Sequence, residues 1–158
     1  MRTKYIQQIN GDSCVIACLE SFLESNGILR TQQSIIEDNG DICKKVRYGF
    51  VEINDQKVLF EREGVLFNEI GSIASTNDCP QMRDAFISLN CNESFIIGII
   101  HQGGMHAVLF DSINFNGDCW VMDPGQGHKK LNTDYQLFNI TNLNFYRISH
   151  HPLTKSIR

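Results

Sequence analysis

The feature that most constrains the fold is a change of hydrophobic period along the chain. Near the N-terminus the apolar side chains recur every three or four residues, the spacing that gives a helix one buried face. This set consists of Val15, Cys18, Leu19 and Phe22. From residue 95 onwards short apolar runs replace the pattern, such as FIIGII at residues 95–100, which is typical of a strand covered on both faces. Helices followed by an antiparallel sheet predict an α+β fold with two packed layers.

The helix expected over residues 14–23 has boundary signals at both ends. Asp12 or Ser13 is placed as its N-cap. Asn26-Gly27 predicts its end, because glycine adopts the left-handed C-cap conformation at little cost. A second, shorter helix is predicted over residues 31–38.

The middle of the chain, residues 41–76, has the weakest pattern. The segment VRYGFVEINDQKVLF favours two short strands about a turn at Asn54-Asp55, and a helix is the alternative. Pro80, at a first helical turn, predicts a further helix that ends near Asn90. In the C-terminal half the turn-forming residues separate four expected strands, at residues 95–100, 106–113, 118–123 and 142–148.

Length and charge limit the classes of function. A chain of 158 residues with 42% hydrophobic residues is long enough to bury one core, so we expect a single domain over residues 1–158. The net charge of −4 and the lack of a basic run argue against a nucleic-acid partner. The sequence contains no apolar stretch of membrane-spanning length and no signal peptide, so a cytoplasmic protein, in its own or in a target cell, is expected.

The cysteines are scattered and form no disulfide framework or zinc motif. We expect reduced thiols and no metal or other cofactor, because the chain is too large to need disulfide bridges and contains no C-x-x-C pair. The six are Cys14, Cys18, Cys43, Cys79, Cys91 and Cys119.

Cys14 is the candidate nucleophile because it opens the first helix. The unpaired N–H groups and the positive end of the helix dipole favour the thiolate form of a cysteine at such a position. The alternative is that Cys14 is a small buried hydrophobic residue, as cysteines often are. A partner histidine is needed to decide between the two.

His106 and Asp123 are the candidate partners of Cys14. If the hairpin loop consists of residues 114–117, Ile113 faces Asp118 and Val108 faces Asp123, which places Asp123 diagonal to His106 on one face of the sheet. A loop longer or shorter by one residue would move the acid to the opposite face.

Other polar residues complete the set of candidates. Gln8 lies just upstream of Cys14 and can donate a hydrogen bond to a developing oxyanion, and Gln7 is the alternative donor. His101 with Asp111 is the second choice for the base. His128 is expected to be solvated in a loop.

This combination resembles the papain-like cysteine peptidases, most closely the bacteriocin-processing double-glycine peptidases. The resemblance rests on Gln8, then Cys14 opening a helix, then H-A-V-L-F from His106 and V-M-D-P-G-Q-G around Asp123. Ser13 stands where the family has an Asp directly before the cysteine, and Val15 replaces the usual glycine. The resemblance implies a papain-like fold, with Cys14 as nucleophile, His106 as base and acid, Asp123 as orienting acid and Gln8 as oxyanion donor.

The resemblance also implies a range of functions. The first expectation is a protease that cuts a protein or peptide, after a Gly-Gly pair, through a thioester intermediate. Some papain-like peptidases of this kind are bacterial toxins or effectors, which would add an immunity protein as a partner. The alternatives are a glutamine deamidase or transglutaminase on the same fold and a catalytically silent module that binds leader peptides.

Overall fold

Six strands and three helices make up the part of the chain that the structure, a computed structural model, describes: residues 3–44, 49–73, 94–101, 104–114, 116–135 and 139–150. The helices are α1 (Cys14–Ser25), α2 (Gln32–Asp38) and α3 (Ile53–Arg62). The strands are β1 (Val65–Ile73), β2 (Ser94–His101), β3 (Gly104–Ile113), β4 (Cys119–Asp123), β5 (Gly127–Lys130) and β6 (Ile140–His150).

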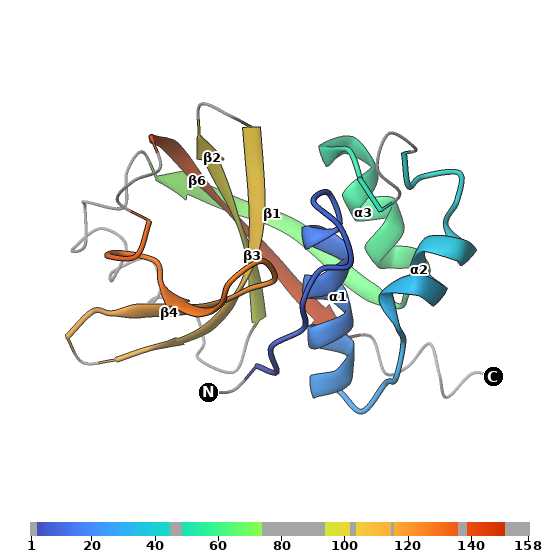
Figure 1. The fold of residues 1–158 in the computed structure, drawn as a ribbon, viewed down its shortest axis with the longest axis horizontal. Helices are drawn as coiled ribbons and strands as arrows, with labels where there is room; N and C mark the ends of the chain where they lie inside the picture. The colour runs from blue at the N-terminus through green and yellow to red at the C-terminus, as the bar shows by residue number, and fades with distance from the viewer. Residues whose placement is uncertain are drawn as a thin grey trace.

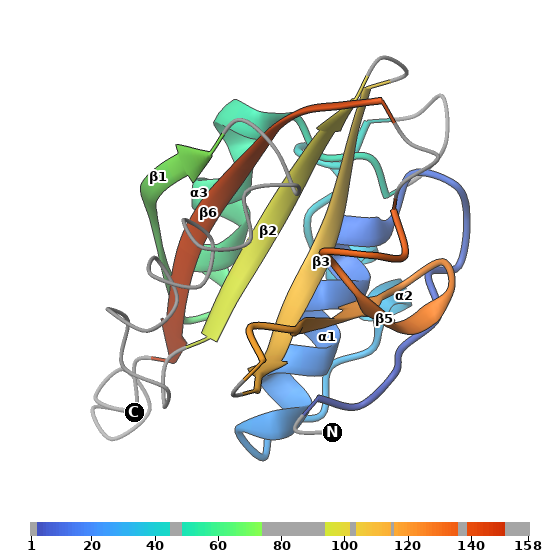
Figure 2. The same ribbon diagram turned by 90° about the vertical axis from the view of Figure 1, so that its left-hand side faces the viewer.

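The strands form one antiparallel sheet in the order β1-β6-β2-β3-β4-β5. The helices lie together on one side of this sheet (Figure 1). With the sheet seen face-on, α1 lies behind β3 and α3 lies behind the β1 and β6 side (Figure 2). The predicted two-layer α+β architecture is confirmed.

Helix α1 begins at the predicted residue, and its C-cap is Asn26, as the Asn26-Gly27 signal predicts. Ser13 occupies the N-cap position, but its hydroxyl contacts the backbone of Asn10 instead of a helix N–H. Gly27, with φ of 77°, ends the helical region as expected. α2 was also predicted, and its N-cap Thr31 accepts a hydrogen bond from the backbone of Ser34 at 3.1 Å.

The strands favoured about Asn54-Asp55 are wrong from Ile53 onward, where the chain forms α3, and residues 46–48 of this segment lie outside the described residues. Gln56, Leu59 and Phe60 are its buried residues, and their i, i+3, i+4 spacing is that of a helix face. The Phe60 ring packs on Phe67 of β1 with a centroid separation of 4.9 Å. The alternative reading as a helix is therefore correct.

β1 follows α3, and the sequence did not predict this strand. It pairs with β6, which lies between β1 and β2, so the last strand of the described residues is a central one. The helix predicted from Pro80 to Asn90 lies outside the described residues.

The hairpin of β3 and β4 differs from the expected register at its loop and agrees with it toward His106 and Asp123. Ile113 pairs with Cys119 and not with Asp118, because the loop is one residue longer than expected. The Asn114 side chain closes this longer loop by accepting from the backbone N–H of Asp118. A bulge between Phe110 and Ser112 then restores the expected register, and Leu109 pairs with Met122.

The expectation that His128 is solvated in a loop is wrong. His128 lies in β5, which pairs with β4, and its side chain is half-buried. Residues 124–126 after β4 form a turn, and β5 returns directly from it.

Buried apolar side chains of the described residues line both faces of the sheet. On the helix face, α1, α2 and α3 pack against alternate strand residues, among them Ile96 and Leu109. On the opposite face, Ile97 and Val121 pack with Leu131 and Tyr135 from the segment after β5. Within the described ranges, the helices are too short or too polar to cross a membrane.

Candidate active site

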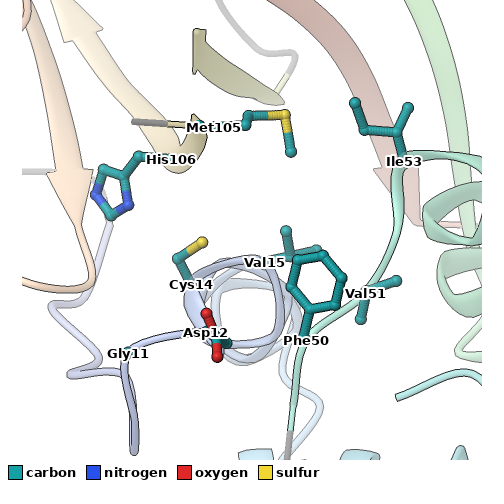
Figure 3. Close-up of a pocket in the computed structure, with 10 residues that line it drawn as sticks. Gly11, Asp12, Cys14, Val15, Phe50, Val51, Ile53, Met105 and His106 are labelled. Atoms are coloured by element: carbon teal, nitrogen blue, oxygen red, sulfur yellow. The ribbon is translucent and has the colours of Figure 1, made fainter. Parts of the chain in front are cut away.

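Cys14 is the first residue of α1, and its side chain borders a cleft between that helix and β3. The residue is 8% exposed, so only a small part of it is accessible. Figure 3 shows its side chain pointing into the cleft, with His106 on one side and Phe50 and Val51 on the other. The helix start therefore presents a thiol to a space that a ligand can enter.

His106 and Asp123 come from adjacent strands and contact each other. The Nε2 atom of His106 lies 2.8 Å from Oδ1 of Asp123, a contact that the restored register of the hairpin allows. The Asp123 side chain is 1% exposed and also accepts hydrogen bonds from the Gly125 N–H and the Tyr135 hydroxyl. The imidazole is thus held by a carboxylate that is itself fixed by the surrounding chain.

Burial and hydrogen bonding act in opposite directions on both members of this pair. Burial lowers the pKa of His106, but hydrogen bonds to Asp123 and Cys14 outweigh it and raise the pKa to about 10. Burial raises the pKa of Asp123, but hydrogen bonds from His106, Tyr135 and Gly125 hold it below its usual value. At neutral pH the site therefore contains an imidazolium between a carboxylate and the sulfur. Because Nε2 is bonded to Asp123, Nδ1 is the ring nitrogen left for Cys14.

Gln8 lies beside the turn that follows Asp123, and Gln7 does not. The Gln8 backbone N–H donates to the Pro124 carbonyl at 2.9 Å, and its side-chain Nε2 donates to the Asn10 carbonyl at 2.6 Å. Its Oε1 atom is buried without a hydrogen-bond partner among the described residues and lies near Gly125. The Gln7 side chain is exposed. This geometry favours Gln8 over Gln7 as a group of the site.

Gln32 of α2 fixes the backbone on both sides of Gln8. Its Nε2 donates to the Gln7 carbonyl at 2.7 Å, and its Oε1 accepts from the Ile9 N–H at 3.3 Å. Gln32 is buried, although glutamine is a residue that sequence patterns place on the surface. Its role was missed because the bonds join segments that are far apart in the sequence.

The cleft at Cys14 has a volume of about 300 Å³ and mostly apolar walls. Its lining residues are Gly11, Asp12, Cys14, Val15, Phe50, Val51, Ile53, Gly104, Met105 and His106. Gly49 lies close against Ser13, the neighbour of Cys14, since a Cβ atom at Gly49 would lie 2.9 Å from Cβ of Ser13. An apolar cleft that ends at a thiol suits a peptide whose backbone approaches the sulfur closely.

The remaining candidates occupy other positions. Cys18 is fully buried one turn after Cys14, as expected, and burial raises the pKa of its thiol. Asp111 is not the partner acid of His101. It accepts hydrogen bonds from Thr3 and Ser112 and lies 3.7 Å from His128. Tyr135 was not identified from the sequence, because no local pattern predicts its hydrogen bond to Asp123, twelve positions earlier in the chain.

A comparison with models of known protein families finds no match, and a comparison with curated proteins finds no relative. Among solved structures, the chain is similar to a double glycine motif protease from an AMS/PCAT transporter in complex with the leader peptide. The TM-score is 0.59 and the identity 12%, over 93% of this chain and 92% of that one.

The chain is also similar to the peptidase domain of Streptococcus ComA, a bi-functional ABC transporter involved in a quorum sensing pathway. Here the TM-score is 0.61 and the identity 16%, over 90% of this chain and 96% of that one. At these identities the likeness concerns the fold, and it confirms the resemblance expected from the sequence at that level. The chain has the papain-like α+β fold of the double-glycine peptidase domains.

Proposed function

We propose that this chain is a cysteine peptidase in which Cys14 is the nucleophile, His106 the base and acid, Asp123 the orienting acid and Gln8 an oxyanion donor. The observation that carries the proposal is the hydrogen-bonded pair of His106 and Asp123 beside a cysteine that opens a helix inside one cleft. A merely structural cysteine needs neither the imidazolium nor the cleft.

The reaction follows from the positions of these groups. The Cys14 thiolate attacks the carbonyl carbon of the scissile bond, and the developing oxyanion accepts hydrogen bonds from the Cys14 backbone N–H and from Gln8. Gln8 uses one side-chain N–H on the Asn10 carbonyl and keeps the other for this purpose. His106 gives its Nδ1 proton to the leaving amine, which departs and leaves a thioester. His106 then takes a proton from water, which attacks the thioester and releases the acid and the thiolate.

We propose a peptide substrate with small residues, a Gly-Gly pair above all, before the cut bond. A residue without a side chain lets the peptide backbone approach a thiol that is only 8% exposed. The crystal structure of the similar double glycine motif protease is of a complex with the leader peptide, which supports a peptide ligand here as well.

Intact-mass analysis of synthetic peptides tests both parts of the proposal. A peptide containing Gly-Gly is expected to give two fragments with the wild type and none with Cys14→Ala, and a matched Val-Val peptide is expected to remain whole. Cleavage that persists in Cys14→Ala would contradict the proposal. A product heavier by about one mass unit with the chain intact would indicate glutamine deamidation, because the same thioester can form on a side-chain amide.

A further inference from the structure

Tyr135 binds the carboxylate oxygen that His106 leaves free. Its hydroxyl donates to Oδ2 of Asp123 at 2.5 Å, while His106 and the Gly125 N–H both contact Oδ1 at 2.8 Å. Tyr135 is 2% exposed and packs in the cluster on the sheet face away from the helices. Each oxygen of the buried acid therefore has a donor of its own.

The chain before Tyr135 is tied to the start of β4. The Leu131 N–H donates to the Cys119 carbonyl at 2.8 Å, and the Asn132 side chain accepts from the Cys119 N–H at 3.2 Å. The Asp134 N–H donates to the Lys130 carbonyl at 2.9 Å. The hydroxyl thus reaches Asp123 from a segment anchored to the same strand, which limits how far the two can separate.

The Tyr135 hydroxyl acts as a proton donor throughout the pH range in which such an enzyme works. Burial raises the pKa of Tyr135, and the hydrogen bond to Asp123 raises it further. The phenol therefore keeps its proton. In return its bond helps to hold the pKa of Asp123 low, so that the carboxylate stays ionised beside His106.

We infer that Tyr135 is a positioning residue that fixes the rotation of the Asp123 carboxylate and, through it, the orientation of His106 toward Cys14. This inference rests on the proposed peptidase function. A carboxylate held at one oxygen can rotate and exchange the oxygen that faces the imidazole, whereas bonds at both oxygens define a single orientation. Tyr135 does not line the cleft, so it is not expected to contact substrate.

The test is Tyr135→Phe, which removes the hydroxyl and keeps the ring. We expect kcat to fall about 10- to 100-fold, the effect of losing a hydrogen bond to a charged group, with KM within about twofold of the wild type. The acid limb of the pH profile of kcat/KM should move toward neutral pH, because the pKa of Asp123 rises when a donor is lost. Wild-type kcat and an unmoved acid limb would overturn the inference.

Tyr146→Phe is the matched control. Tyr146 is buried on the helix face, where its ring stacks on Phe67 with a centroid separation of 5.0 Å, and the hydrogen bonds of Asp123 come from other residues. This variant should retain the wild-type kcat and pH profile. Equal changes in both variants would show that a lost buried hydroxyl acts only through general stability, and would overturn the inference.

Two measurements keep this test separate from that of the proposed function. The rate of Cys14 alkylation by iodoacetamide, corrected with Cys14→Ala, needs no substrate and should show the same shift of its acid limb in Tyr135→Phe. Nuclear magnetic resonance of the wild type should show a slowly exchanging, downfield hydroxyl proton for Tyr135, which needs no variant to fold. Absence of peptide cleavage with both signals present would contradict the peptidase and leave the positioning role standing. Absence of both signals would overturn the positioning role.

Discussion

The buried aspartates Asp123 and Asp111 lie on neighbouring strands, and each faces a histidine. Asp123 and His106 are 2.8 Å apart, whereas Asp111 and His128 are 3.7 Å apart. Both histidine side chains are about one quarter exposed, at 25% and 23%. By residue type and burial the two pairs are nearly equivalent.

The two pairs differ in what lies in front of the histidine. His106 faces a cleft that also contains the Cys14 sulfur. The carboxylate of its partner Asp123 is held by Gly125 in the turn after β4 and by Tyr135 in the segment after β5. At the other pair, Thr3 fills the space. Its backbone N–H and hydroxyl donate to Asp111 at 2.7 and 2.6 Å.

The second pair therefore fastens the N-terminal segment to the sheet. His128 donates from Nε2 to the Thr3 carbonyl at 2.9 Å, which completes the contact from the other side. The comparison teaches that an acid beside a histidine does not identify a catalytic pair. The proposed chemistry also needs a thiol at an open cleft, and only the His106 pair has one among the described residues.

The largest expected effect comes from removing the sulfur at the first pair. Cys14→Ala should lower kcat by about 10⁴-fold or more, because the covalent step is lost. The melting temperature should stay within a few degrees, since the lost atom borders the cleft. Peptide cleavage and thermal unfolding measure the two quantities.

Cys18→Ala is the control for that variant, one turn along the same helix. Cys18 is fully buried, and its thiol contacts the Ala107 carbonyl at 3.7 Å. We expect kcat near the wild-type value and a loss of about 1 kcal/mol in the free energy of unfolding. Retained activity in Cys14→Ala, or abolished activity in Cys18→Ala, would refute the assignment of the nucleophile.

The next largest loss of activity is expected at His106, and His128 provides the comparison. His106→Asn should lower kcat by about 10³-fold, because proton transfer is lost, and should also reduce the free energy of unfolding at neutral pH, because the buried Asp123 carboxylate loses its charged partner. His128→Asn should leave kcat within about threefold and reduce the free energy of unfolding by about 1 kcal/mol, through the weakened contact with Thr3. Equal losses of activity in the two variants would mean that the distinction between the pairs is wrong.

Local patterns were enough to predict the elements that carry Cys14, His106 and Asp123. α1 has an apolar stripe and a glycine end, and both signals lie within the segment itself. The register of His106 and Asp123 came from loop length and alternation. It held near the site only because a bulge beside Asp111 offset a loop one residue longer than expected.

Contacts between distant segments could not be predicted in this way. The bond from Tyr135 to Asp123 depends on the path of the chain after β5, and the bonds of Gln32 depend on how α2 meets the N-terminal segment. Segment 53–62 has its helical face defined by packing on β1, a strand that the sequence did not reveal. These features arise from tertiary packing, which overrides local propensity.

The pH dependence should also separate the two pairs. The pKa of His106 is raised to about 10, so the imidazolium and the cleavage activity should persist up to that pH and fall about tenfold per unit above it. Asp123→Asn should move this alkaline limb to lower pH, because the partner that stabilises the charge is gone. An alkaline limb that stays in place would contradict the pairing.

The same shift has a consequence for stability. Because the folded pKa of His106 lies above its unfolded value, its contribution to stability is complete below about pH 6.5 and is lost as pH rises through about 10. The free energy of unfolding of His106→Asn should therefore fall less over this range than that of the wild type. Urea unfolding at pH 6, 8 and 10 measures the difference.

The smallest effect on activity is expected at Asp111, where the change should act on stability. Burial raises the pKa of Asp111, but hydrogen bonds from Thr3 and Ser112 hold it below the usual value. The carboxylate therefore stabilises the fold above about pH 4 and loses this effect as pH falls through the lower, folded pKa. Asp111→Asn should reduce the free energy of unfolding at pH 7 by about 2 kcal/mol, with kcat within about twofold, and the deficit should shrink below pH 4. A deficit that is the same at pH 3 and pH 7 would show that the charge of Asp111 does not fasten the N-terminal segment.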